Sequence, residues 1–268
     1  MIEGILLLWF IMVALSLAFT AYDVRVMPID WVQKLGWVLV VAYTGPIGLF
    51  FYLLTCRSPG TGLHAIYTKP TWKQSVNSEV HCLAGDATGI IFAAIALSFF
   101  QMNNGTELIL EYISAFIFSW VIFQAGMMVN MYENYWQALK KTFFAETVSM
   151  NCVMIGMIPT MLFLMHELNN GHGPAHAAFW FSMGMATIVG GITAYPINQY
   201  LVTNHLKHGS MTKEDSQPDS SKTDQQTSEP HHHMKDIDSK TKWLMIGSTF
   251  AGLFVIVSIT SFFVPIRF

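Results

Sequence analysis

The chain has 268 residues, of which 53% are hydrophobic and only 12% are charged, and its mean hydropathy is +0.42. These values lie far from those of an ordinary soluble domain, and with a formal net charge of −3 we expect no nucleic-acid partner. A membrane-crossing helix needs roughly 20 apolar residues to span about 30 Å of hydrocarbon. The composition therefore predicts an all-α, polytopic integral membrane bundle in contact with the lipid bilayer.

Seven apolar runs are long enough to cross a membrane, and in chain order they cover residues 4–21, 33–54, 79–100, 110–130, 143–165, 177–201 and 243–264. The first run begins MIEG, without basic residues, and is too long for the core of a signal peptide, so we expect a retained membrane helix. We divide the chain into two N-terminal transmembrane helices, a four-helix core, a disordered loop and a C-terminal transmembrane helix, at residues 1–69, 70–206, 207–241 and 242–268.

Lysine and arginine are distributed unevenly over the connections between these runs. The connections after the second, fourth and sixth runs hold eleven of them, whereas the other side holds only Arg25, Lys34 and Arg267. Cytoplasmic loops of membrane proteins carry the excess of these residues. Seven spans then predict a cytoplasmic N-terminus and an external C-terminus, in the cell membrane.

The third run opens with ionisable groups, in the stretch EVHCLAGDATG. At 100° per residue, Glu79, Cys82 and Asp86 share one face of a helix, and His81 points elsewhere. Ionisable groups are expensive inside a membrane and usually face a partner or a wet cavity. The alternative is that Glu79 and His81 only cap the helix at the interface, while Asp86 bonds to a neighbouring helix.

Two other runs bring polar groups to the same depth. Glu146 lies in the inner part of the fifth run, and Asn198 lies near the cytoplasmic end of the sixth. We therefore expect polar side chains from three helices to converge on one level. Beside them, two rows of small residues predict close approach of helix backbones: Gly85, Gly89 and Ala93, and Ala186, Gly190 and Ala194.

The fifth run also carries a row of methionines. On an ideal helix they fall within a narrow arc that continues from Glu146 toward His166 at the outer end, and they are Met150, Met154, Met157, Met161 and Met165. Thioether sulfur is a soft ligand that selects Cu(I) among metal ions. The alternative is that these side chains only fill gaps in an apolar core, as methionine commonly does.

Histidines flank the membrane runs on both sides. The short outer connection HELNNGHGPAH holds His166, His172 and His176 without any lysine or arginine. The segment 207–241 has a disordered composition, apart from the tract His231, His232, His233 and Met234. Short histidine-rich tracts recruit metals, although a solvated linker is the alternative for this segment.

Three stretches resemble an uncharacterised membrane family, domain of unknown function 4396, over about residues 70–209: HCLAGDATGI (81–90), AETVSM (145–150) and FWFSMGMATIVGGITAYPINQYLVTNHLKHG (179–209). The resemblance implies a His-Cys pair followed by Gly85, an acidic residue before Thr-Val-Ser at Glu146, and a Pro-hydrophobic-Asn motif ending at Asn198 before a basic-histidine tail. This sequence departs from the family at Asp86, where a cysteine is frequent, and at Ile90, where an acidic residue is frequent. The family itself implies no function.

We expect a non-enzymatic membrane protein that binds a transition metal, with copper favoured, and that transports it or hands it over. Its expected partner is a metal donor or acceptor protein. In this hypothesis the outer histidines collect the ion, the methionine face conducts it, and Cys82, Asp86 and Glu146 form an inner site. Two alternatives stay open: a carboxylate-based proton or cation transporter, and a non-transporting subunit or assembly factor of a membrane metalloenzyme. The candidate metal ligands are His81, Cys82, Asp86, Glu146, Met150, Met154, Met157, Met161, His166, His231, His232 and His233.

Overall fold

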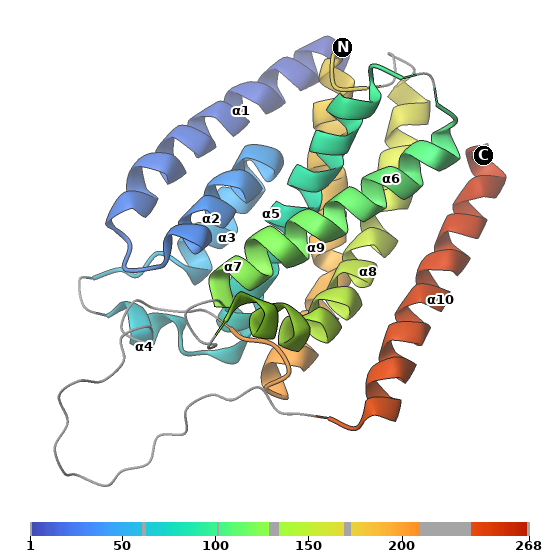
Figure 1. Cartoon of the computed structure of the whole chain (residues 1–268). Helices are drawn as coiled ribbons and strands as arrows, with labels where there is room; N and C mark the ends of the chain where they lie inside the picture. Colours follow the sequence, from blue (N-terminus) through green and yellow to red (C-terminus); the bar gives the residue numbers. More distant parts are fainter. Residues whose placement is uncertain are drawn as a thin grey trace, which may run out of the picture.

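The computed structural model describes residues 2–60, 63–100, 102–128, 134–168, 173–209 and 237–266. All regular structure in these ranges is helical (Figure 1), and six helical segments there are long and apolar enough to cross a membrane. The prediction of a polytopic all-α bundle is therefore confirmed. The six segments are α1 (Ile2–Asp23) with η1 (Val24–Val26), α5 (Thr71–Leu97), α6 (Asn104–Phe116) with the π-helix η2 (Ile117–Gln124) and α7 (Ala125–Met128), α8 (Tyr135–Leu168), α9 (Ala177–Thr203) and α10 (Ser239–Phe263).

The apolar run at residues 33–54 is not a single helix, so the described residues hold six of the about seven expected transmembrane helices. It forms two short helices, α2 (Trp31–Thr44) and α3 (Pro46–Thr55), separated by Gly45 at φ +58°. Glycine adopts this conformation without steric cost, and the following proline suits the first turn of α3. The rings of Trp37 and Tyr52, one on each helix, have centroids 5.4 Å apart. The two helices are thus antiparallel arms of one hairpin.

The tip of this hairpin reaches the middle of the bundle and turns back. A Cβ atom on Gly45 would lie 2.7 Å from the Cγ2 atom of Val13, which is halfway along α1. On the other side, a Cβ on Gly184 of α9 would lie 2.5 Å from the carbonyl oxygen of Tyr43. Irregular backbone at membrane depth is tolerated where protein buries it, and here α1 and α9 do so. The α2–α3 hairpin is a re-entrant element, and the short helix α4 (His64–Thr68) follows it.

One asparagine of α5 joins both arms of the hairpin at its base. The Oδ1 atom of Asn77 accepts hydrogen bonds from Trp37 Nε1 at 3.2 Å and from Gln33 Nε2 at 3.3 Å. Its Nδ2 group donates to the carbonyl oxygen of Thr55 at 3.1 Å. All of these side chains are buried, so Asn77 satisfies polar groups that lipid could not.

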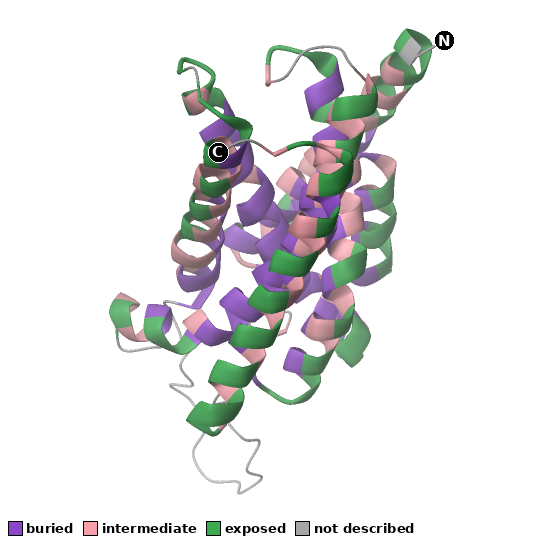
Figure 2. Cartoon of the chain, turned by 90° about the vertical axis from the view of Figure 1, so that its right-hand side faces the viewer, coloured by how far each residue is buried: buried purple, intermediate pink, exposed green. Residues whose placement is uncertain are grey.

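With six membrane crossings in place of seven, both ends of the chain lie on the same side of the membrane, and the expected orientation changes. The chain enters α1 and leaves α10 at the same end of the bundle (Figures 1 and 2). Every lysine and arginine in the described ranges belongs to the opposite half, where α5, α8 and α10 begin. The excess of positive residues on cytoplasmic loops then predicts that both chain ends face outward, the reverse of the cytoplasmic N-terminus expected from seven spans.

Among the six long segments, α5, α8 and α9 are the most buried, whereas α1 and α10 lie at the periphery with largely exposed faces (Figure 2). Both expected rows of small residues lie at close contacts. A Cβ on Gly85 would collide with the Ser119 backbone, and one on Gly89 would lie 2.6 Å from Ala115 Cα. A Cβ on Gly190 would lie 2.5 Å from Met157 Cγ. The first row therefore packs against α6 and η2, and the second against α8.

Candidate functional site: a buried lysine–thiol–carboxylate network

Polar side chains from α5, α8, α9 and η2 meet in the half of the bundle that holds the described lysines and arginines, as expected for three of these helices. Cys82, Glu146, Ser149 and Asn198 are all fully buried there. The Cys82 thiol donates to Glu146 Oε2 at 3.3 Å, and the Ser149 hydroxyl donates to Asn198 Oδ1 at 2.9 Å. The predicted convergence of these residues on one level is confirmed.

The π-helix η2 contributes a further partner for the carboxylate. Its Ser119 hydroxyl donates to Glu146 Oε1, and the backbone approach at Gly85 described above is what lets it reach that far. π-helical turns often occur at functional sites. With Cys82 on one oxygen and Ser119 on the other, the Glu146 carboxylate has a donor for each of its atoms.

The centre of the network is Lys207, which we had assigned to a disordered loop beginning at that residue. Its ammonium has three protons and donates to Cys82 Sγ at 2.8 Å, Asn198 Oδ1 at 2.8 Å and Ser149 Oγ at 3.1 Å. The Nζ atom lies 4.0 Å from Glu146 Oε2, and both side chains are fully shielded from solvent. The expected domain boundary at residue 207 is therefore wrong, because the folded core includes this lysine.

A tight turn at the end of α9 brings Lys207 back into the bundle. His205 adopts φ +57°, in the left-handed region. The Leu206 N–H donates to the Leu201 carbonyl at 2.8 Å, and the His205 N–H donates to the Val202 carbonyl at 3.1 Å. This pair of bonds is the Schellman arrangement that closes a helix C-terminus. The chain thus reverses within four residues of Thr203, and Lys207 points at Cys82.

Electrostatics keeps this lysine charged. Burial alone would lower the pKa of the Lys207 ammonium, but the neighbouring Cys82 and Glu146 raise that pKa above its ordinary value. The result is a buried ion pair with Glu146, and breaking such a pair leaves an uncompensated charge.

Three further ionisable groups of α5 lie close to the network without joining it. Asp86 is fully buried and interacts electrostatically with Glu146, yet neither of its oxygens accepts a hydrogen bond from a described residue. The Ser119 hydroxyl lies beside Asp86, but it has one proton, which it gives to Glu146. Glu79 is buried with Oε1 unpartnered, near Gly191 of α9. His81 faces α2, where a Cβ on Gly36 would lie 3.6 Å from Nδ1, as the helical geometry predicted.

The expected inner metal site finds no support. Among the described residues, no three His, Cys, Asp or Glu side chains come together in a way that could hold a metal ion. The donor atoms of Cys82 and Glu146 face the Lys207 ammonium, which repels a metal cation. His166 and His176 are exposed at the outer ends of α8 and α9, and His172, His231, His232, His233 and Met234 lie outside the described residues.

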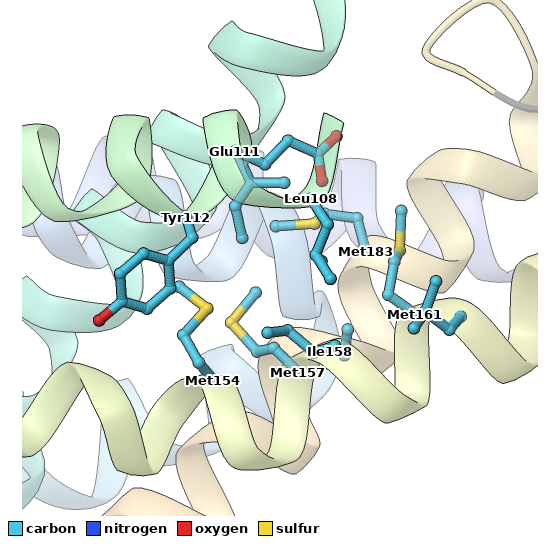
Figure 3. A pocket seen from close by; sticks show the side chains of 11 residues that line it. Leu108, Glu111, Tyr112, Met154, Met157, Ile158, Met161 and Met183 are labelled. Carbon is cyan, nitrogen blue, oxygen red and sulfur yellow. The ribbon is translucent and has the colours of Figure 1, made fainter. Parts of the chain in front are cut away.

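The methionine face of α8 is divided between the core and a cavity. Met150, Met154 and Met157 are buried, and Met161 is partly buried. Met154, Met157 and Met161 line a cavity together with Met183 of α9 (Figure 3), a residue that the helical pattern of α8 alone could not identify. Lys207 was also missed, although the basic-histidine tail of the family resemblance includes it; no local pattern shows that this lysine turns inward.

Comparison with known proteins gives a family and no function. No curated protein and no solved structure matches the chain at a significant level. A family model described as a domain of unknown function, DUF4396, matches residues 71–207. The match begins at the first residue of α5 and ends at Lys207, so it contains the whole polar network and covers more than half of the chain. This multi-pass membrane protein therefore belongs to the DUF4396 family.

Proposed function

We propose that this protein is a membrane transporter that exchanges protons for a cation at the buried site between α5, α8 and α9. The observation that carries the proposal is the Lys207 ammonium, a tethered cation held on Cys82 Sγ, Asn198 Oδ1 and Ser149 Oγ beside Glu146. The sulfur and oxygen atoms that accept hydrogen bonds from the ammonium could also bind a free cation if Lys207 moved away. We place the protein in the cell membrane with its basic end in the cytoplasm, and we assign it no enzymatic activity.

The charge balance of the site supports proton or cation binding. Glu79, Asp86 and Glu146 supply three buried carboxyl groups, and Lys207 supplies one positive charge within their reach. An isolated ionised carboxylate in an apolar environment is too costly to persist. Two of the three carboxyl groups therefore need a proton or a cation in order to stay buried.

Proton binding at Glu146 gives the site a way to change state. A neutral Glu146 no longer compensates Lys207, and a buried ammonium without its partner is strongly destabilised. Lys207 would then withdraw toward the cytoplasmic end, where the turn at His205 begins. Its departure exposes the oxygen and sulfur atoms that it covered, so protonation and cation access become linked.

The other two functions considered from the sequence have weaker support at this site. Copper binding at Cys82 and Glu146 lacks a third ligand of the usual kind, because no three His, Cys, Asp or Glu side chains of the described residues come together there. An assembly role would require a partner protein, and the polar network is closed inside a single chain. A copper function is better argued from the methionine cavity, which is a separate location.

Transport in proteoliposomes tests the proposal. Vesicles with an acidic interior are given external Na⁺, K⁺ or Li⁺ in turn, and loss of the pH gradient is followed with a pH-sensitive dye. We expect at least one cation to collapse the gradient faster than in empty vesicles. Glu146→Gln should abolish this response, whereas Glu167→Gln, at the exposed end of α8, should not. A wild-type response equal to that of empty vesicles for all three ions would remove the proposal.

A further inference from the structure

A second candidate site lies on the outward side of the polar network. It is a partly open cavity of about 60 Å³ lined by α6, α8 and α9, with α5 contributing Ile90 (Figure 3). Along α8, Met154 lies two turns beyond Glu146, so the two sites occupy successive levels of the same helix. The volume is sufficient for a metal ion or a few water molecules.

Sulfur dominates the wall of this cavity. Met154, Met157 and Met161 come from α8 and Met183 comes from α9, and side chains of both helices turn toward the same space (Figure 3). Methionine is flexible and usually closes gaps in a core, and protein interiors leave few voids larger than a water molecule. Four methionines surrounding an open cavity are therefore poorly explained as filler.

One carboxyl group stands among these apolar atoms. Glu111 of α6 lines the cavity, and its charge has no cation nearby, because the described lysines and arginines belong to the opposite half of the bundle. The neighbouring charged group is Glu107, one turn earlier, which only adds repulsion. The other polar group of the wall, the Tyr112 hydroxyl, already donates to Asn151 Oδ1 at 2.7 Å. Glu111 therefore has no counter-ion among the residues that the structure describes.

From this combination we propose that the cavity binds a soft monovalent cation, Cu(I) or its analogue Ag(I), through the sulfurs of Met154, Met157, Met161 and Met183, with Glu111 balancing its charge. Thioether ligands are neutral and select Cu(I) over hard cations such as Na⁺ or Mg²⁺. A single carboxylate matches a single positive charge. This site is independent of the proton exchange proposed for Lys207 and Glu146.

Metal binding to the detergent-purified protein tests the site directly. Ag(I) is titrated calorimetrically and Cu(I) by competition with a coloured chelator, and X-ray absorption reports the ligand atoms. We expect one ion per chain with a sulfur-dominated shell. The double variant Met157→Leu with Met183→Leu removes two sulfurs at similar volume and should weaken binding by roughly tenfold or more. Glu111→Gln should weaken it by a smaller factor.

The control is Met127→Leu, which changes a buried methionine of α7 outside the cavity wall. Its affinity should equal that of the wild type, and thermal unfolding of every variant checks that the bundle is intact. Equal affinity for the wild type and the double variant, or equal losses in the double variant and the control, would overturn the proposal. The double variant should keep the proton exchange of the wild type, because Met157 and Met183 lie outside the Lys207 network, so loss of proton exchange and loss of metal binding are separate outcomes.

Discussion

The polar network and the methionine cavity solve the problem of burying charge in opposite ways. In the network, Lys207 and Glu146 neutralise each other, and three protons of the ammonium meet three acceptors. In the cavity, Glu111 lies among thioethers with open volume beside it, and every lysine and arginine of the described residues belongs to the opposite half of the bundle. The Glu146 carboxylate is thus paired with the protein's own lysine, whereas no described lysine or arginine pairs with the Glu111 carboxyl group. A cation that binds in the network must compete with Lys207 for its ligands. A cation that binds in the cavity has no lysine of the described residues to displace.

The largest expected effect is loss of the built-in cation. Lys207→Met leaves Glu146 buried and uncompensated, which should lower the free energy of unfolding by about 3–5 kcal/mol. The double variant Lys207→Met with Glu146→Gln removes both charges and should recover most of this loss. Thermal unfolding in detergent measures both. If the single variant were as stable as the wild type, the ion pair would not be what completes the network.

Variants that push apart the helices of the network should lower the free energy of unfolding by a smaller amount. Gly85→Leu pushes α5 away from the Ser119 backbone, and overpacking of this kind typically costs about 1–3 kcal/mol. Gly190→Leu should do the same between α9 and α8. Gly247→Leu on α10 is the matched control, because a side chain there meets nothing within 4 Å. Equal melting temperatures for all three variants would contradict the close contacts.

The smallest expected change sharpens the contrast in metal binding. Cys82→Ser keeps a hydroxyl between Lys207 and Glu146, so we expect a stability change of about 1 kcal/mol, the size of one altered hydrogen bond. Its Cu(I) affinity should equal that of the wild type, whereas Met157→Leu should lower that affinity. The same chelator competition compares the two variants. If Cys82→Ser lowered the Cu(I) affinity and Met157→Leu did not, the metal would bind at the inner site of Cys82 and Glu146 instead of the cavity.

Helix periodicity predicted most of what the bundle needs. It placed Cys82, Glu146 and Asn198 together because lipid rejects such groups unless they face one another, and the structure joins them. The α2–α3 hairpin was not predicted, because hydropathy shows how long an apolar run is and does not show whether the chain turns back within it. Gly45-Pro46 is nevertheless a turn signal. Lys207 was missed because its contact with Cys82 spans 125 positions. A polar residue just beyond a helix looks like a loop residue unless its partner is known.

The re-entrant hairpin has a consequence for the order in which the chain is assembled. Its two arms share one asparagine, and Asn77 is synthesised 22 positions after Thr55, the residue whose carbonyl it binds. Until α5 enters the membrane, Gln33 and Trp37 lack this acceptor. Residues 31–55 thus emerge from the ribosome as an apolar segment that could also be threaded across the bilayer. We therefore expect the final topology of the first 60 residues to be fixed only after α5, which follows them, has entered the membrane.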